Sequence, residues 1–198
     1  MTTSNDTTKS VEDMTEEERR ELHYNFRVNR NIPPRYKECS KETIPKEIKE
    51  KINQAMKEKK GIFLYGEAGT GKTYIMYSIL KEFYKEGHES TMFTDMPWLS
   101  MRIKNYIRDN EDPQENVKIY TTPEYLFLDD FGVEKMTDFL FETLYLIIDT
   151  RYNYLKPTFI SSNYSLKEIA ENINDRIASR ISEMCVVIKV EGKDKRVK

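Results

Sequence analysis

Residues 66–73 read GEAGTGKT and match the pattern G-x-x-x-x-G-K-[ST] through Gly66, Gly71, Lys72 and Thr73. The run IFLY at 62–65 precedes them and is typical of a short buried strand. The stretch 72–87 follows as a helix with its apolar residues on one face. A glycine-rich turn between a strand and a helix is where this pattern binds nucleotide phosphates. The alternative is a strand–turn–helix junction that carries its lysine by chance.

The residue types in this loop suit phosphate chemistry. Glycines let backbone N–H groups turn toward phosphates, and the following helix adds its positive amino-terminal end. Lys72 would neutralise the β- and γ-phosphates of ATP, and Thr73 would ligate Mg²⁺. The whole loop is the candidate cofactor-binding segment: Gly66, Glu67, Ala68, Gly69, Thr70, Gly71, Lys72 and Thr73.

Beyond the loop, apolar strands alternate with helices. The sequence predicts further strands at 90–95, 125–130, 157–162 and 185–190, and helices at 96–110, 136–152 and across 166–183. The stretch EDPQEN at 111–116 is interpreted as a loop. Strands that are apolar on both faces and separated by helices form a parallel sheet covered on both sides. We therefore expect an α/β fold with a five-stranded parallel sheet sandwiched between helices.

The segment before the loop contains two predicted helices. A polar tail precedes a capping box at Thr15 and Glu18, which starts a helix over 15–28. A second helix is predicted from 44 to 59. Leu22 and Phe26, one turn apart on the first helix, either dock a partner or pack on the chain's own core, and we expect the core contact. The predicted domains are 1–31, a possible docking segment, and 32–198.

Two adjacent carboxylates end the strand YLFLDD at 125–130. Paired acids at the end of a buried strand must be solvated or matched by a cation. Asp129 is placed to hold Mg²⁺, and Asp130 can orient or activate an attacking water. Asn163, in FISSN after the fourth strand, could orient the same water or sense the γ-phosphate, or it could simply form a turn.

Two arginines flank a stripe of isoleucines in the last helix. Arg176 and Arg180 are four residues apart, which fits a solvated basic face. The alternative is an arginine finger that reaches the γ-phosphate bound to a neighbouring subunit, with Arg151 as a further candidate. Arg196, after the last strand, could contact the nucleotide of its own subunit or could be tail charge.

The predicted helix at 96–108 mixes aromatic and basic residues: Trp98, Arg102, Lys104, Tyr106 and Arg108. Stacking on bases and contacts with phosphates would suit single-stranded DNA. An amphipathic helix with a basic outer face explains the same residues. The net charge of −2, from 32 basic and 34 acidic side chains, gives no overall attraction to nucleic acid, so DNA binding would need such a local patch.

Composition indicates a cytoplasmic protein. The first twenty residues are polar and acidic, unlike a signal peptide, and the most apolar stretch, FLFETLYLII at 139–148, is too short to span a bilayer. Cys39 and Cys185 fit no metal or redox spacing and are interpreted as reduced thiols. We expect no membrane association.

In series, these motifs resemble those of AAA+ ATPases of the DnaC/DnaI helicase-loader type and the related IstB transposition helpers. The resemblance runs from about residue 32 to 196, with GEAGTGKT as Walker A, LFLDDFG as Walker B, FISSNYS as sensor 1, RIASRI as the finger helix and GKDKR as sensor 2. It implies an AAA+ P-loop NTPase fold, here expected without a C-terminal helical lid domain. It also implies Asn163 as sensor 1, Arg180 as the finger in trans and Arg196 as sensor 2.

The function implied by this resemblance is ATP hydrolysis with Mg²⁺ in DNA replication. Its partners would be single-stranded DNA and a replicative helicase or a transposase, and ATP would bridge subunits into a homo-oligomer. Members of the loader family usually carry a helicase-binding domain before the core, and here residues 1–31 precede it. The alternatives are an IstB-like transposition helper or a nucleotide-gated adaptor with slow hydrolysis. A kinase is disfavoured, because no kinase catalytic loop precedes the DFG at 130–132.

Overall fold

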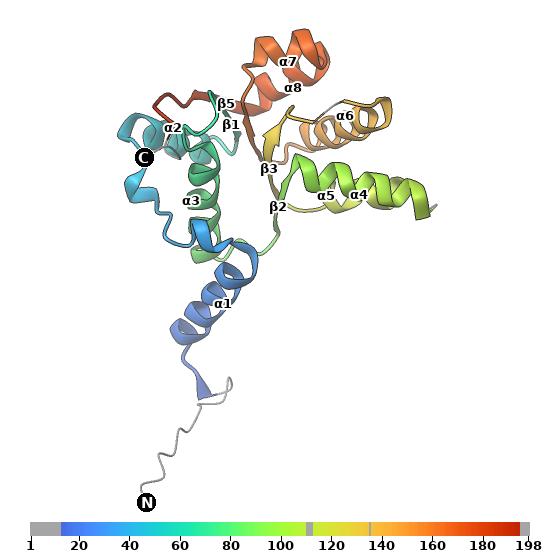
Figure 1. Cartoon of the computed structure of the whole chain (residues 1–198). Helices are drawn as coiled ribbons and strands as arrows, with labels where there is room; N and C mark the ends of the chain where they lie inside the picture. Colours follow the sequence, from blue (N-terminus) through green and yellow to red (C-terminus); the bar gives the residue numbers. More distant parts are fainter. Residues whose placement is uncertain (1–12, 110–112, 135, 195–198) are drawn as a thin grey trace, which may run out of the picture.

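One parallel sheet organises the molecule. The computed structural model describes residues 13–109, 113–134 and 136–194. The strands are β1 (Gly61–Tyr65), β2 (Thr91–Asp95), β3 (Tyr125–Phe131), β4 (Thr158–Ser162) and β5 (Cys185–Lys189). They form a 5-stranded sheet in the order β2-β3-β4-β1-β5, with every neighbouring pair parallel (Figure 1). The predicted five-stranded parallel sheet is confirmed.

Helices cover both sides of this sheet. They are α1 (Glu16–Asn31), α2 (Lys46–Lys57), α3 (Lys72–Lys85), α4 (Met96–Asp109), α5 (Pro113–Thr121), α6 (Asp138–Asn153), α7 (Leu166–Asn172) and α8 (Asp175–Met184), with 3-10 turns η2 (Pro34–Tyr36) and η3 (Lys41–Thr43). Figure 1 shows α1, α2 and α3 on one side and α4, α5 and α6 on the other. None of the helices in the described ranges is both long enough and apolar enough to cross a membrane.

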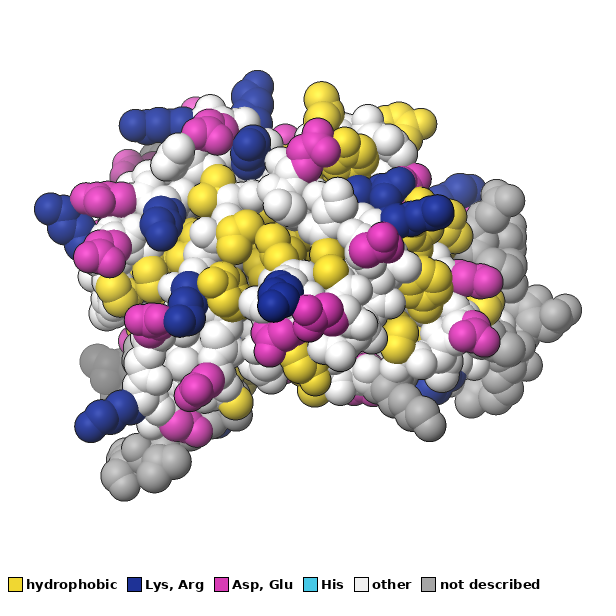
Figure 2. All heavy atoms as spheres, turned by 90° about the horizontal axis from the view of Figure 1, so that it is seen from above, with side chains coloured by type: hydrophobic (Ala, Val, Ile, Leu, Met, Phe, Trp, Pro, Cys, Tyr) yellow, Lys and Arg dark blue, Asp and Glu magenta, His cyan; other side chains and the backbone are white. Residues whose placement is uncertain are grey.

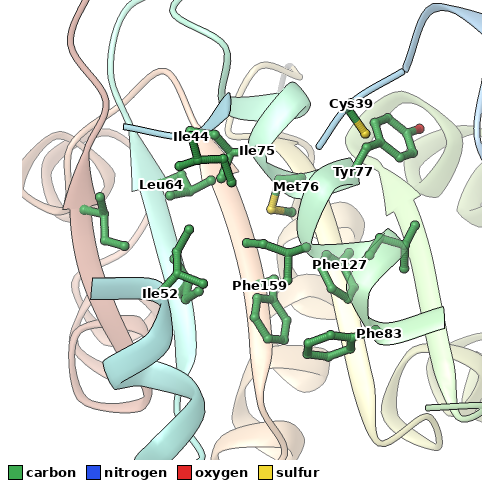
Figure 3. Packing of buried hydrophobic residues seen from close by; sticks show 14 of the residues in the cluster. Cys39, Ile44, Ile52, Leu64, Ile75, Met76, Tyr77, Phe83, Phe127 and Phe159 are labelled. Carbon is green, nitrogen blue, oxygen red and sulfur yellow. The ribbon is translucent and has the colours of Figure 1, made fainter. Parts of the chain in front are cut away.

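Each face of the sheet has its own hydrophobic core, because successive strand residues point to opposite faces. The core under α2 and α3 is built from Leu64, Phe127 and Phe159, with Ile52 from α2 and Ile75, Met76 and Phe83 from α3 (Figure 3). The opposite core contains Phe63, Leu126, Leu128 and Ile160, packed by α4, α5, α6 and α8. Burial on both faces is the reason why the strands appear in the sequence as continuous apolar runs.

The prediction of a loop over 111–116 is wrong for residues 113–116. Pro113 opens α5, and the residues after it are helical. Proline lacks a backbone N–H but is tolerated in the first helical turn, where that N–H would have no intrahelical acceptor. Asn116 and Tyr120 of α5 are buried against the second core. Residues 110–112 lie outside the described ranges.

The expected core contact of Leu22 and Phe26 is also wrong. Their side chains are 47% and 57% exposed on α1. The face of α1 that contacts the core carries Tyr24, Val28 and Arg27 instead. The guanidinium of Arg27 lies 4.0 Å from the centre of the Tyr84 ring. It also donates a 2.8 Å hydrogen bond to the carbonyl oxygen of His88. A cationic side chain thus attaches α1 to α3 and leaves Leu22 and Phe26 toward solvent.

The strand order determines where the functional residues meet. β4 lies between β1 and β3, so the carboxyl ends of these three strands are adjacent at one edge. The glycine loop leaves β1 there, the paired aspartates end β3, and Asn163 follows β4. Ligands bind parallel α/β sheets outside the carboxyl ends of the strands, so this edge is the candidate site.

Candidate nucleotide-binding site

The glycine loop connects β1 to α3 through backbone conformations that need glycine. Gly66, Gly69 and Gly71 have positive φ angles, and Gly71 is the N-cap of α3. A Cβ added to Gly66, at φ +148°, would lie 2.3 Å from the carbonyl oxygen of Val190. The loop therefore tolerates no side chain at Gly66, for reasons of both backbone conformation and space.

A second contact of the loop was missed by sequence reasoning. A Cβ on Gly69 would lie 2.0 Å from a carboxylate oxygen of Asp194. The segment after β5 therefore lies against the loop, and the N–H of Val190 donates a 2.7 Å hydrogen bond to the carbonyl oxygen of Tyr65. Arg196, the predicted sensor 2 residue, lies outside the described residues. The signal in the sequence that could have identified Asp194 is its position inside GKDKR, two residues before Arg196.

Lys72 joins the loop to the end of β4. It is 5% exposed, and its ammonium donates hydrogen bonds to the carbonyl oxygens of Gly66 and Glu67 at 2.7 and 2.8 Å. A third hydrogen bond, of 2.8 Å, runs to Oδ1 of Asn163. The structure thus brings together two predicted site residues that are 91 positions apart in the sequence.

Asp129 is the buried member of the aspartate pair. It is 4% exposed, and its Oδ1 accepts a short hydrogen bond from the Ser161 hydroxyl. Burial raises the pKa of Asp129 above its usual value, and hydrogen bonds from the Ser161 and Thr73 hydroxyls act in the opposite direction. Thr73 and Asp129, the two predicted Mg²⁺ ligands, are therefore in contact.

Asp130 has a different environment from its neighbour. It adopts a left-handed backbone conformation with φ +57°, which is uncommon for a residue other than glycine. Its backbone N–H donates a 3.1 Å hydrogen bond to the hydroxyl oxygen of Ser161. Asp130 lines the cavity at the edge of the sheet, together with Asn163 and the loop residues from Ala68 to Thr73.

This cavity has a volume of about 660 Å³ and a lining of mixed chemistry. The glycine loop, Asp130 and Asn163 supply polar groups, and Ile44, Pro45 and Ile48 supply apolar ones. Cavities of roughly 300–1,000 Å³ that combine apolar walls with a few polar groups are typical of small-ligand sites. Seen from above, hydrophobic side chains gather along the middle of the molecule between charged ones (Figure 2).

The donor set fits Mg²⁺ together with phosphate. Within the described ranges, no group of three or more His, Cys, Asp and Glu side chains could hold a metal ion by itself. Mg²⁺ typically binds one or two carboxylates, substrate phosphates and several waters. The Asp129 carboxylate beside the Thr73 hydroxyl and the glycine loop matches that pattern.

Arg180 is held within its own subunit. Its Nε donates a 2.6 Å hydrogen bond to Asp149 of α6, and its guanidinium also bonds the Tyr145 hydroxyl at 3.1 Å. Arg176, one turn earlier on α8, has an exposed side chain. The two candidates for the finger therefore differ in how firmly this structure holds them.

Arg151 is excluded as a finger because it is fully buried. Its guanidinium donates hydrogen bonds to the Thr158 hydroxyl and to the carbonyl oxygens of Tyr120, Pro123, Glu124 and Pro157. Burial lowers the pKa of Arg151 to about 10, so the side chain stays charged at neutral pH. Its role is to hold the ends of β3 and β4 that are opposite the site.

The helix α4 presents its aromatic and basic residues to solvent. Trp98 is 64% exposed and Met101 44% exposed. The guanidinium of Arg102 lies 5.5 Å from the centre of the Tyr106 ring. Lys104 is exposed as well. The surface that sequence analysis considered for single-stranded DNA is therefore accessible.

Comparison with protein families gives one match. A family model described as Microtubule binding matches residues 2–140. By this match, residues 2–140 belong to the Microtubule binding family. The match ends inside α6, so it includes β1, β2 and β3 but neither β4 nor β5. It therefore covers the glycine loop and the aspartates without Asn163 or the arginines of α8.

Curated relatives point to replication. The chain is 29% identical over 150 residues to the replicative helicase loader DnaI of Bacillus subtilis, covering 69% of this chain and 48% of that protein. It is 21% identical over 177 residues to the replicative helicase loader DnaC of Escherichia coli K12, covering 84% and 72%. The chain spans about half the length of the first curated relatives that it matches.

Solved structures share the fold over most of the chain. A crystal structure of the DnaC helicase loader matches with a TM-score of 0.70 and 26% identity, covering 80% of this chain and 100% of that one. AMPPCP-bound DnaA from Aquifex aeolicus has a TM-score of 0.69 at 19% identity, covering 84% and 53%, which shows the fold alone.

The family model is described as Microtubule binding, whereas DnaI and DnaC are named as helicase loaders. The relative DnaC and the DnaC crystal structure cover 84% and 80% of this chain, whereas the family model matches residues 2–140. The wider agreement decides the assignment. The chain is a helicase-loader-like AAA+ protein, distantly homologous to DnaC and DnaI over most of its length.

Proposed function

We propose that the chain binds ATP with Mg²⁺ in the 660 Å³ cavity and hydrolyses it while acting on single-stranded DNA with a replicative helicase. The observation that carries this proposal is the meeting of Lys72, Asp130 and Asn163 at one edge of the sheet. The relatives named as replicative helicase loaders support the helicase as partner. We propose a cytoplasmic location for the same reason.

The polar and apolar parts of the cavity lining suit the phosphates and the base of ATP. The apolar wall of Ile44, Pro45 and Ile48 would face the base, and the glycine loop with Lys72 would hold the phosphates. Thr73 and Asp129 would hold Mg²⁺, which neutralises charge on the phosphate oxygens when it is bound. Gly66 to Thr73 form the phosphate cradle.

Hydrolysis needs a group that orients the attacking water. The Asp130 carboxylate lines the cavity and would act as base or orienter. Asn163 would keep its Oδ1 on Lys72 and direct its amide NH2 toward the water or γ-phosphate, the position of a sensor 1 residue. Arg180 would supply positive charge in trans, and Arg196 would act as sensor 2.

Arg180→Ala is expected to reduce ATP turnover by about 10³-fold or more at unchanged ATP affinity, because a finger stabilises charge that develops only in the transition state. The measurement is steady-state phosphate release beside equilibrium nucleotide binding. Arg176→Ala on the same helix is the matched control and should retain turnover. The reverse pattern would assign the finger to Arg176.

A second candidate is a nucleotide-gated adaptor with slow hydrolysis, which includes an IstB-like helper of a transposase. The bonds from Arg180 to Asp149 and Tyr145 favour it, because the finger must leave these partners before it reaches a neighbouring subunit. ATP would then mainly assemble a homo-oligomer over the core 32–198. The exposed Leu22 and Phe26 on α1 support a docking role for residues 1–31.

The first experiment is ATP turnover of the purified protein with and without single-stranded DNA, with Lys72→Ala as the blank. Turnover that rises with DNA supports a DNA-acting ATPase and the exposed surface of α4 as its contact. Tight ATP binding with negligible turnover in both conditions supports the adaptor. Absence of ATP binding refutes both candidates.

A further inference from the structure

The paired aspartates occupy an irregular position in the sheet. Leu128 of β3 pairs with Ile160 of β4, and Phe131 pairs with Ser162. Two residues of β3 therefore lie opposite one residue of β4, Ser161. This arrangement is a β-bulge, and bulges next to active sites re-aim side chains.

Ser161 contacts both residues of the bulge. Its side chain is fully buried, its hydroxyl hydrogen goes to Oδ1 of Asp129, and its oxygen accepts the N–H of Asp130 at 3.1 Å. A hydroxyl offers one donor and two acceptor sites, so it satisfies both neighbours at once. The N–H of Asp130 thus bonds a side chain where a regular strand would offer a backbone carbonyl.

The bulge explains how two consecutive carboxylates can serve one site. In a regular strand, neighbouring side chains point to opposite faces of the sheet. The left-handed conformation of Asp130, at φ +57°, breaks this alternation. Asp130 then lines the cavity, while Asp129 contacts Thr73 at the start of α3.

We propose that Ser161 is a positioning residue that sets the geometry of Asp129 and Asp130 together. The inference rests on the proposed function, because it concerns the metal and water positions of that site. With the hydroxyl removed, Asp129 loses a donor that fixes its carboxylate, and the N–H of Asp130 loses its acceptor. The bulge is then free to relax, and the Mg²⁺ position is lost before the nucleotide position.

The test compares Ser161→Ala with Ser162→Ala. Ser162 is the matched control: it is also fully buried and makes two hydrogen bonds, to Phe131 and Tyr164, but it contacts neither aspartate. Thermal unfolding is measured with ATP alone and with ATP plus Mg²⁺, and turnover is measured separately. Ser161→Ala should lose most of the Mg²⁺-dependent increase in melting temperature and at least about 10-fold in turnover, while ATP affinity without Mg²⁺ stays within about twofold.

A hydroxyl-bearing variant should restore the site. Ser161→Thr keeps the donor and acceptor, and Ser161→Val has nearly the shape of threonine without them. Retention of the Mg²⁺ response in Ser161→Thr, together with its loss in Ser161→Val, supports the inference. The same two variants provide the test if Ser161→Ala does not fold.

Four results overturn the proposal. A Mg²⁺ response and turnover unchanged in Ser161→Ala, or equal losses in Ser162→Ala, would show that the hydroxyl of Ser161 has no special role. Loss of the response in Ser161→Thr would show the same. A wild-type protein that binds ATP without any Mg²⁺ response would refute the proposed function itself, and the inference with it.

Discussion

Lys72→Ala is expected to raise the dissociation constant for ATP by about 100-fold or more, because charge-assisted hydrogen bonds are worth about 1.5–3 kcal/mol each. The ammonium of Lys72 is held at the base of the loop by two backbone carbonyls and by Asn163. That position lies where the β- and γ-phosphates would meet the amino terminus of α3. Equilibrium titration with a fluorescent ATP analogue measures the effect directly.

The same helix provides a matched control. Lys81 of α3 also directs its ammonium at two backbone carbonyls, those of Lys37 and Cys39, at 2.5 and 2.9 Å. It contributes no atom to the cavity lining. Lys81→Ala should lower thermal stability and leave ATP affinity within about twofold of wild type, as expected for a structural lysine. Equal losses of affinity in both variants would contradict a specific role for Lys72.

Asp130→Asn is expected to lower turnover by about 10²–10⁴-fold, the usual range for removal of a general base, with ATP affinity preserved. The substitution keeps the size of the side chain, so the left-handed backbone at this position is accommodated as well as before, since Asn tolerates it. Single-turnover hydrolysis beside nucleotide titration separates chemistry from binding. Asp138→Asn, at an exposed position in the first turn of α6, is the control.

Asp130→Ala also distinguishes the two candidate functions. In a machine driven by hydrolysis, this variant should abolish activity with DNA and partner. In an adaptor, it should assemble with ATP and bind its partner as the wild type does, because those steps need the nucleotide rather than its hydrolysis. Failure of assembly in this variant would count against the adaptor.

The strands of the fold could be predicted because the burial of a strand determines the residue types along that strand. The three central strands β1, β3 and β4 are buried on both faces, so they appear as apolar runs, and the glycine loop marks the junction of β1 and α3. The orientation of α1 could not be predicted in this way. Leu22 and Phe26 form one apolar pair, yet α1 contacts the core through Tyr24, Val28 and Arg27. The pattern of hydrophobic residues contains no sign of the cation–π contact between Arg27 and Tyr84.

The candidate site was predicted as residue types but not as geometry. Asp129, Asp130 and Asn163 were identified because polar groups at the ends of buried strands need a reason. Their arrangement depends on the β-bulge and on Ser161, which joins strands that are 31 positions apart in the sequence. The contact of Asp194 with Gly69 likewise forms only when the chain returns past the loop after β5. Such long-range contacts leave no periodic pattern in the sequence.

The exposure of Trp98 has a practical consequence. It is the single tryptophan among 13 tyrosines and 9 phenylalanines, and it lies on the outer surface of α4. Indole fluorescence excited beyond the tyrosine band therefore comes from one known residue, which is not among those that line the cavity. The unmodified protein thus carries an optical reporter on the very surface where single-stranded DNA would stack, and nucleotide filling the cavity does not touch that reporter directly.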